Sequence, residues 1–181
     1  MEERIEVTAA RKCSASGSPE LLATSVADIM TTRLTTLSPH HTFGEAVQLM
    51  ANSPFRHFLV INADRTLAGV FSDRDVLRAL GRTPNWQAKA VSGVMTRYVV
   101  TVNPKTPLSI AAMLMLERRI NCLPVVDDDR KVCGILTSTD LLSVYQKMQA
   151  SLEAAQNGTA SLPSSCDRLP AETKEHGYET R

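Results

Sequence analysis

Two seven-residue segments of this chain carry side chains that could bind a phosphate and a sugar. They are Gly69 to Asp75 (GVFSDRD) and Gly134 to Asp140 (GILTSTD). Both read Gly, two apolar residues, Ser or Thr, two variable residues and Asp. This pattern predicts a strand leading into a helix N-terminus, where free backbone N–H groups and a hydroxyl bind phosphate readily. An Asp carboxylate accepts hydrogen bonds only, which suits the two vicinal hydroxyls of a ribose.

The same residues have a second interpretation that needs no ligand. Ser72 or Thr137, followed three positions later by Asp75 or Asp140, is close to a capping box that only closes the start of a helix. A single copy of the motif does not decide between the two interpretations. Its duplication and its surroundings favour ligand binding.

The motif belongs to a longer segment that occurs twice at a constant offset of 65 residues. The recurring pairs include Val26 and Val91, Met30 and Met95, Thr36 and Thr101, Ala46 and Ala111, Gly69 and Gly134, and Asp75 and Asp140. Two halves of one repeated unit can bury their apolar faces against each other. We therefore expect a pseudo-twofold module with two related sites.

Each copy is expected to run strand, helix, strand, strand, helix, an α/β (α+β) arrangement. Apolar residues at i, i+3, i+4 and i+7 predict the first helices, with Phe43, Ala46, Val47 and Met50 in one copy and Leu108, Ala111, Ala112 and Met115 in the other. The predicted strands are 34–37, 57–61 and 67–71, then 99–102, 122–126 and 132–136. The final helices begin at Ser72 and Thr137. An apolar stripe carries the second to Asn157-Gly158 through Leu141, Val144, Tyr145, Met148, Leu152 and Ala155.

These patterns divide the chain into five parts. Residues 1–24 form a tail with a short leading helix at Ser18-Pro19-Glu20, 25–82 the first repeat, 83–90 a linker, 91–149 the second repeat, and 150–181 a helix extension with a disordered tail. Trp86 in the linker is expected to pack down as an anchor.

Composition limits the classes of function. The 181 residues hold 20 Lys and Arg against 19 Asp and Glu, so a formal charge of +1 predicts no general attraction to nucleic acid or to an anionic membrane. No apolar run approaches the roughly 20 residues of a membrane span, and Met1 to Pro19 lacks a secretory core, so a cytoplasmic protein is expected. The four cysteines have no disulfide or zinc spacing and read as reduced thiols.

Neither a metal centre nor a catalytic centre is expected. His40 and His41 have no ligand spacing with Cys122 or Cys133, and no nucleophile stands with a base and an orienting group. We therefore expect no enzyme activity and no cofactor.

The motifs together resemble the CBS (cystathionine β-synthase) domain family, whose tandem pairs are called Bateman modules. The resemblance rests on Asp28-Ile-Met-Thr31 and Gly93-Val-Met-Thr96, Thr36-Leu-Ser-Pro39 and Thr101-Val-Asn-Pro104, Cys122-Leu-Pro-Val-Val-Asp127, and the two Gly-to-Asp motifs. It covers roughly 25–149. It implies two tandem β-α-β-β-α repeats, a regulatory role, a homodimer, and an adenine nucleotide ligand such as AMP, ADP or ATP, or sometimes NAD or S-adenosylmethionine.

The resemblance also implies two sites that each draw on both copies. The first would use Ser72 and Asp75 with Arg56 and Arg74 for phosphate, and Thr96, Val100 and Cys122 around the base. The second would use Thr137 and Asp140, with Thr31, Thr35 and His57 opposite. Since Arg56 and Arg74 correspond to Asn121 and Thr139, tighter binding is expected at the first site.

Some of these residues also have plainer interpretations. Arg74 reads equally well as a solvent-facing arginine, and His57 as an edge-strand histidine with its hydrogen bonds satisfied. Leu59 stands where the second copy has Pro124, so the local backbone of the two copies is expected to differ.

Two functions remain. The leading hypothesis is a stand-alone regulatory sensor, in which AMP or ATP bridges the repeats and a partner protein of unknown identity reads the result. The alternative is a dimerisation and interaction module whose clefts are vestigial and bind nothing.

Overall fold

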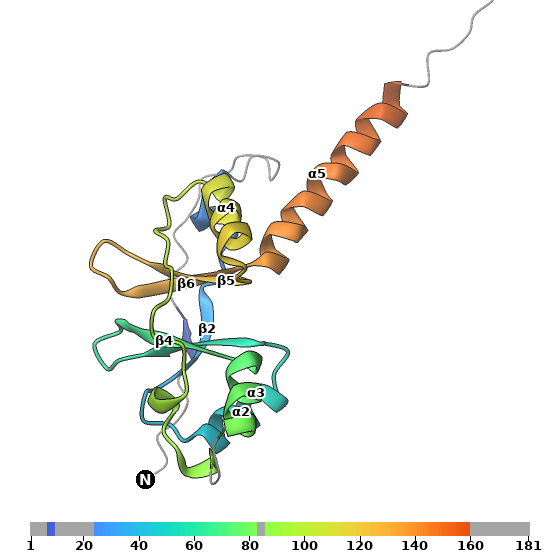
Figure 1. Ribbon diagram of the computed structural model, residues 1–181. Coiled ribbons are helices and arrows are strands. Elements are labelled where there is room, and N and C mark those ends of the chain that lie inside the picture. Colours follow the sequence, from blue (N-terminus) through green and yellow to red (C-terminus); the bar gives the residue numbers. More distant parts are fainter. Residues whose placement is uncertain (1–6, 10–23, 83–85, 160–181) are drawn as a thin grey trace, which may run out of the picture.

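The computed structural model describes residues 7–9, 24–82 and 86–159. Figure 1 shows two halves, each with a hairpin of strands and helices against it, and one long helix extending away from the second half. The first repeat contains β2 (Arg33–Leu37), α2 (Phe43–Ala51), β3 (His57–Ile61), β4 (Leu67–Ser72) and α3 (Asp73–Arg82). The second repeat contains α4 (Leu108–Arg118), β5 (Cys122–Val126), β6 (Val132–Thr137) and α5 (Ser138–Thr159).

The first repeat has the predicted order of strand, helix, strand, strand, helix. In its sheet β2 runs parallel to β3, and β3 runs antiparallel to β4 with His57 opposite Ser72. The second sheet pairs β5 with β6, which places Cys122 opposite Thr137. In both hairpins the second strand runs directly into the last helix, so the Ser or Thr of the motif ends a strand and the Asp lies in the first turn of a helix.

The first strand of the second repeat differs from its prediction. Residues 99–101 do not form a strand, and only Val102 pairs with β5, through a single parallel bridge to Val125. Pro124 occupies the position that Leu59 holds in the first repeat. Because proline has no N–H, Pro124 does not form the pair that Leu59 makes with Thr36; residues 33–35 of β2 pair with β1 and not with β3. The Val102 N–H still donates to the Pro124 carbonyl at 3.1 Å.

The N-terminal tail also differs from its prediction. Residues Val7–Ala9 form strand β1, which pairs antiparallel with β2 so that Val7 lies opposite Thr35. The open edge of β2 explains the pairing, since its backbone groups would otherwise face solvent. The predicted leading helix at Ser18 to Glu20 and the tail beyond Thr159 lie outside the described residues.

The helix predictions are confirmed. Phe43 and Ala46 on α2 are fully buried; on α4, Ala111, the counterpart of Ala46, is fully buried and Met115, the counterpart of Met50, is buried as well. Helix α2 begins at a capping box, in which the Glu45 N–H donates to Thr42 Oγ1 at 3.2 Å and the Thr42 N–H donates to Glu45 Oε2 at 2.7 Å. The predicted anchor Trp86, in the short helix η2 (Trp86–Ala88), packs edge-on against Phe43 with ring centroids 5.2 Å apart.

The segment leading into each repeat packs on the other repeat. Val26, in helix α1 (Val26–Ile29), belongs to the core of the second repeat, and Val91, in helix η3 (Val91–Gly93), belongs to the core of the first. Thr31 then forms a two-bond bridge with Ile135, and Thr96 forms one with Val70. The core of each repeat is thus completed by the segment that leads into the other repeat.

A third apolar cluster lies between the two sheets. It is built from Leu59 and Val70 of the first repeat and from Cys122 and Val132 of the second. Strand β3 is therefore buried on both faces, since Phe58 and Val60 point into the core of their own repeat. The two repeats form one module joined by a continuous apolar interior.

The crossing of each leading segment over a hairpin explains the glycine of the motif. A Cβ on Gly69 would lie 2.6 Å from the Thr96 carbonyl oxygen, and one on Gly134 would lie 2.7 Å from Met30 Sδ. At both positions a larger residue would force its neighbours to move, backbone at Gly69 and the Met30 side chain first at Gly134.

We expect Gly69→Ala to lower the free energy of unfolding by about 1–3 kcal/mol, because the Cβ meets backbone oxygen that is held by the Val70 bridge. Gly134→Ala should cost less, since its closest neighbour is a flexible methionine side chain. Gly93→Ala, with nothing within 4 Å, is the control. Urea denaturation of the three variants measures the order, and equal losses at positions 69 and 93 would contradict it.

Candidate functional site

Both motifs make the capping interaction that the sequence leaves open. The Ser72 N–H and Oγ donate to Asp75 Oδ2 at 2.9 and 2.7 Å. In the second repeat the Thr137 N–H and Oγ1 donate to Asp140 Oδ2 at 2.7 and 2.6 Å. One carboxylate oxygen at each site is thereby used to start the helix. What the other oxygen contacts decides whether a ligand can be bound.

At the first site the second carboxylate oxygen is fully occupied. Thr96 Oγ1 donates to Asp75 Oδ1 at 3.1 Å, and Arg78 Nη1 lies 3.4 Å from the same oxygen. Asp75 is only 3% exposed. A carboxylate offers about four lone-pair sites, and at Asp75 four donor groups fill them.

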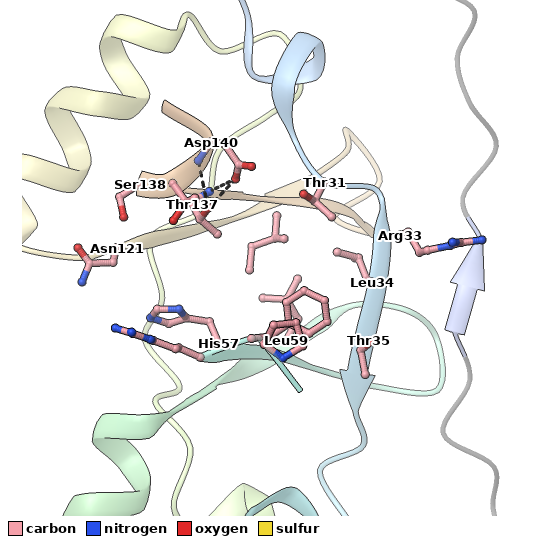
Figure 2. Close-up of a pocket in the computed structure, with 15 residues that line it drawn as sticks. Thr31, Arg33, Leu34, Thr35, His57, Leu59, Asn121, Thr137, Ser138 and Asp140 are labelled. Carbon is pink, nitrogen blue, oxygen red and sulfur yellow. Dashed lines mark hydrogen bonds between the residues drawn. The ribbon is translucent and has the colours of Figure 1, made fainter. Parts of the chain in front are cut away.

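At the second site the corresponding oxygen has no protein partner. Within the described part of the chain nothing donates to Asp140 Oδ1. Asp140 lines a pocket of about 640 Å³, a volume typical of small-molecule sites. Figure 2 shows Asp140, Thr137 and Ser138 on one side of this pocket, with His57 and Leu59 facing them across it.

The pocket lies between the two repeats. Its lining from the second repeat is Asn121, Ile135, Thr137, Ser138, Thr139 and Asp140; its lining from the first is Thr31, Arg33, Leu34, Thr35, Pro54, Phe55, Arg56, His57 and Leu59. All five residues that the sequence assigns to a second site, namely Thr31, Thr35, His57, Thr137 and Asp140, are brought together here. Their contact with a ligand stays a prediction.

Arg56 is placed differently from its prediction. The sequence assigns it to phosphates at the first site, but it lies in the wall of the second pocket, just before β3. The expectation of tighter binding at the first site rests largely on this arginine, so the geometry does not support that order. Arg33 also reaches the pocket wall, but Figure 2 shows its side chain extending away toward β1.

The other residues assigned to the first site are spread over several environments. Arg74 is exposed at the start of α3. Val100 packs against the core of the second repeat, and Cys122 belongs to the cluster between the sheets. Burial, and secondarily the negative charge of Asp75, raises the pKa of the Cys122 thiol to about 11, so the thiol stays protonated and unreactive near neutral pH.

Sequence reasoning missed the apolar part of the pocket. Leu34, Leu59 and Ile135 line it although they lie on strands whose other residues fill the cores. Successive side chains of β3 and β6 point to opposite faces of each strand, so Leu59 and Ile135 lie on the face away from the cores that Phe58 and Leu136 fill. This alternation could have identified them. Ser138 and Thr139, the variable positions of the motif, were also missed.

The helix starts at the two sites also differ in charge. The first helix begins with Asp73 and Arg74, whereas the second begins with Ser138 and Thr139. A carboxylate at a helix N-terminus competes with a bound anion for the same backbone groups, while hydroxyl groups can donate to it. The second site is therefore better suited to phosphate.

Among the described residues no group of three or more His, Cys, Asp or Glu side chains could hold a metal ion. Within the same part of the chain, no helix combines the length and the apolar character needed to cross a bilayer.

Comparison with known proteins identifies the fold. The family model described as "CBS domain" matches residues 26–82 and 91–147. The chain belongs to the CBS-domain family. It carries two CBS domains in tandem, the arrangement of a Bateman module, and CBS domain pairs are typically regulatory.

Several CBS proteins are similar over most of the described module. The CBS domain-containing protein YhcV of Bacillus subtilis (strain 168) is 37% identical over 118 residues, which is 65% of this chain and 82% of that protein. The solved structure of CBSX2 in complex with AMP is 32% identical, with a TM-score of 0.63 over 70% of this chain and 99% of the other.

Two other matches show the range of proteins that contain this module. The CBS domain pair of protein MJ0100, solved with 5′-methylthioadenosine and S-adenosyl-L-methionine, is 29% identical, with a TM-score of 0.62 over 67% of this chain and 99% of that one. A homoserine O-acetyltransferase of Methanococcoides burtonii is 31% identical over 121 residues. That match spans 67% of this chain but about a quarter of the length of the acetyltransferase.

His57 makes the stability of the folded protein depend on pH. Burial lowers its pKa below the ordinary value of 6.5; Arg56 and Arg74 lower it further, and Asp73 and Asp75 oppose the shift. In the unfolded chain the same imidazole takes up a proton at higher pH than in the folded protein. The unfolded state therefore binds more protons as the pH falls below 6.5, and folding becomes less stable.

We expect the free energy of unfolding to decrease between about pH 7.5 and about pH 5.5, and His57→Gln to decrease less steeply over this range. The other histidines are unchanged in the variant, so the difference between the two slopes reports on His57. Denaturant titrations at several pH values measure both slopes. Parallel slopes for the two proteins would rule out a lowered pKa at His57.

Proposed function

We propose that this protein is a regulatory sensor that binds an adenine nucleotide in the pocket beside Asp140. The observation that carries the proposal is Asp140, which lines a pocket of about 640 Å³ between the two repeats and whose Oδ1 accepts no hydrogen bond from the described residues. A carboxylate in a pocket wall, with one oxygen fixed by a helix start and the other without a protein donor, is well placed to accept hydrogen bonds from a ribose.

The other groups of the pocket match the remaining parts of a nucleotide. Leu34 and Ile135, which are partly buried, supply an apolar surface for a purine ring. The hydroxyls of Ser138 and Thr139 and the Thr139 N–H, at the N-terminus of α5, can donate to phosphate, while the Ser138 N–H donates to the Asn121 carbonyl at 3.0 Å. Arg56, on the opposite wall, can pair with phosphate oxygens through its guanidinium group.

The charge of the pocket favours AMP, ADP or ATP over other adenosine compounds. Arg56 contributes a permanent positive charge, and among the described residues that line the pocket Asp140 is the sole carboxylate. A sulfonium group such as that of S-adenosylmethionine would have to approach this arginine without an additional carboxylate partner. The CBS pairs of CBSX2 and MJ0100, solved with AMP and with adenosine derivatives, support an adenosine-bearing ligand of this general class.

Regulation follows from the location of the pocket. A ligand that contacts Asp140 of one repeat and Arg56 or His57 of the other favours whichever packing of the repeats brings these walls together. Such a ligand shifts the equilibrium only by its difference in affinity for the two arrangements. We propose that a partner protein recognises the arrangement that the nucleotide favours.

We expect Asp140→Ala to weaken nucleotide binding by about 1.5–3 kcal/mol, because it removes a charged hydrogen-bond acceptor from the pocket. Asp75→Ala is the matched control, since it removes the equivalent helix cap but no free acceptor. Calorimetric titrations with AMP, ATP, NAD and S-adenosylmethionine measure the affinities, and circular dichroism confirms that both variants are folded.

The same titrations separate sensor from interaction module. Absence of heat and of thermal stabilisation with every adenine compound at about 1 mM would favour the alternative, a ligand-independent dimerisation module. A loss of affinity in Asp75→Ala with none in Asp140→Ala would restore the order of sites expected from the sequence.

We also propose that the module forms a homodimer through its exposed helix faces. Large apolar side chains are exposed on three helices, namely Leu77 and Leu80 on α3, Ile110, Met113 and Leu116 on α4, and Leu142, Tyr145, Met148 and Leu152 on α5. Helix α5 extends away from the body of the protein (Figure 1). Extended apolar surface of this kind marks an association surface in soluble proteins.

Leu116, which is 79% exposed, provides the test. We expect Leu116→Glu to shift the protein from dimer to monomer in sedimentation velocity, because a buried carboxylate without a partner opposes association. Ala63→Glu adds the same charge in the exposed turn between β3 and β4 and should leave the dimer intact. A monomeric wild-type protein at micromolar concentration would contradict the homodimer.

A further inference from the structure

We propose that Arg78 keeps the first site closed, so that each chain binds one nucleotide and not two. This inference rests on the proposed nucleotide-binding function of the Asp140 pocket. It concerns a residue that the repeated motif does not include, since Arg78 follows the motif by three positions. Arg78 would thus determine which of the two sites can bind the nucleotide, without itself contacting the ligand.

The contacts of Asp75 carry the argument. Arg78 Nη1 lies 3.4 Å from Asp75 Oδ1, and the Thr96 hydroxyl donates to that same oxygen. With Ser72 occupying Oδ2, no lone pair remains for the hydroxyls of a ribose. The site is saturated by groups of the protein itself.

The second repeat lacks the equivalent of Arg78. At the constant offset of 65 residues the corresponding position is Ser143, an exposed residue whose side chain is too short to reach the carboxylate as an arginine does. Thr31 corresponds to Thr96, yet within the described residues it makes no hydrogen bond to Asp140. The two sites share their motif, but the first has Arg78 beside its carboxylate where the second has Ser143.

Opening the first site would replace a charged partner of Asp75 by a neutral one. A ribose hydroxyl is neutral, and it would have to replace a guanidinium beside a carboxylate that is 3% exposed. A buried carboxylate that exchanges a charged partner for a neutral one loses the stronger, charge-assisted interaction. The side chain of Arg78 is 55% exposed, so the arginine itself can be replaced without creating a cavity.

Exchanging the two residues between the repeats tests the proposal. Arg78→Ser gives the first repeat the residue of the second, and Ser143→Arg does the reverse. In isothermal titration with AMP we expect one site per chain in the wild type, a second binding event in Arg78→Ser, and binding at least tenfold weaker in Ser143→Arg. Ser143→Gln, similar in length but uncharged, should bind AMP as the wild type does.

Two further variants complete the design. Lys105→Ser removes a positive charge from an exposed turn and should leave one site per chain, which excludes an effect of net charge. The double variant Arg78→Ser, Thr96→Ala removes both donors from Asp75 Oδ1. A single site in both Arg78→Ser and the double variant would overturn the role given to Arg78.

The outcomes also distinguish this inference from the proposed function. Two equivalent AMP sites in the wild type, or unchanged affinity in Ser143→Arg, would overturn the role of Arg78 and leave nucleotide binding intact. No AMP binding in the wild type or in any of the variants would overturn the proposed function, and the role of Arg78 with it.

Discussion

The structure depends on the exchange of leading segments between the repeats. Val26 fills the core of the second repeat and Val91 fills the core of the first, so neither repeat buries its apolar surface alone. The exchange requires each segment to cross a hairpin at close range, and Gly69 and Gly134 leave the space for it. The same crossing carries Thr96 and Thr31 to the helix starts of the opposite repeats. The packing that joins the repeats therefore also assembles both sites from two parts of the chain.

Two nearly identical motifs produce sites with different properties, because a carboxylate has a limited number of acceptor positions. Asp75 and Asp140 each use one oxygen to begin a helix, so the contacts of the remaining oxygen decide the chemistry. Protein donors occupy that oxygen at Asp75, whereas at Asp140 no described residue donates to it and the residue lines a pocket. The capping and ligand-binding interpretations of the motif are thus compatible at Asp140. At Asp75 the cap and the protein's own donors account for the whole carboxylate.

Most of the fold could be predicted from the sequence, because a duplicated segment implies two similar structural halves that pack against each other. The helices at Phe43 and Leu108 follow from apolar spacing, and the family match confirms the tandem pair. Two elements departed from prediction where backbone hydrogen bonding overrode the pattern. Pro124 limits the pairing of Val102 with β5 to one bridge, and Val7–Ala9 pair with the open edge of β2. Neither effect appears in the spacing of apolar residues.

The sequence by itself determined the repeat and the positions of the two carboxylates, and its family resemblance indicated five of the polar residues that line the second pocket. Only the tertiary structure decided that Arg56 belongs to that pocket and that Arg78 contacts Asp75. The physical reason is that motifs record the residues a site needs, and these are alike in both repeats. Whether a site is open depends on side chains outside the motif, whose reach and direction are set by the packing of one repeat against the other.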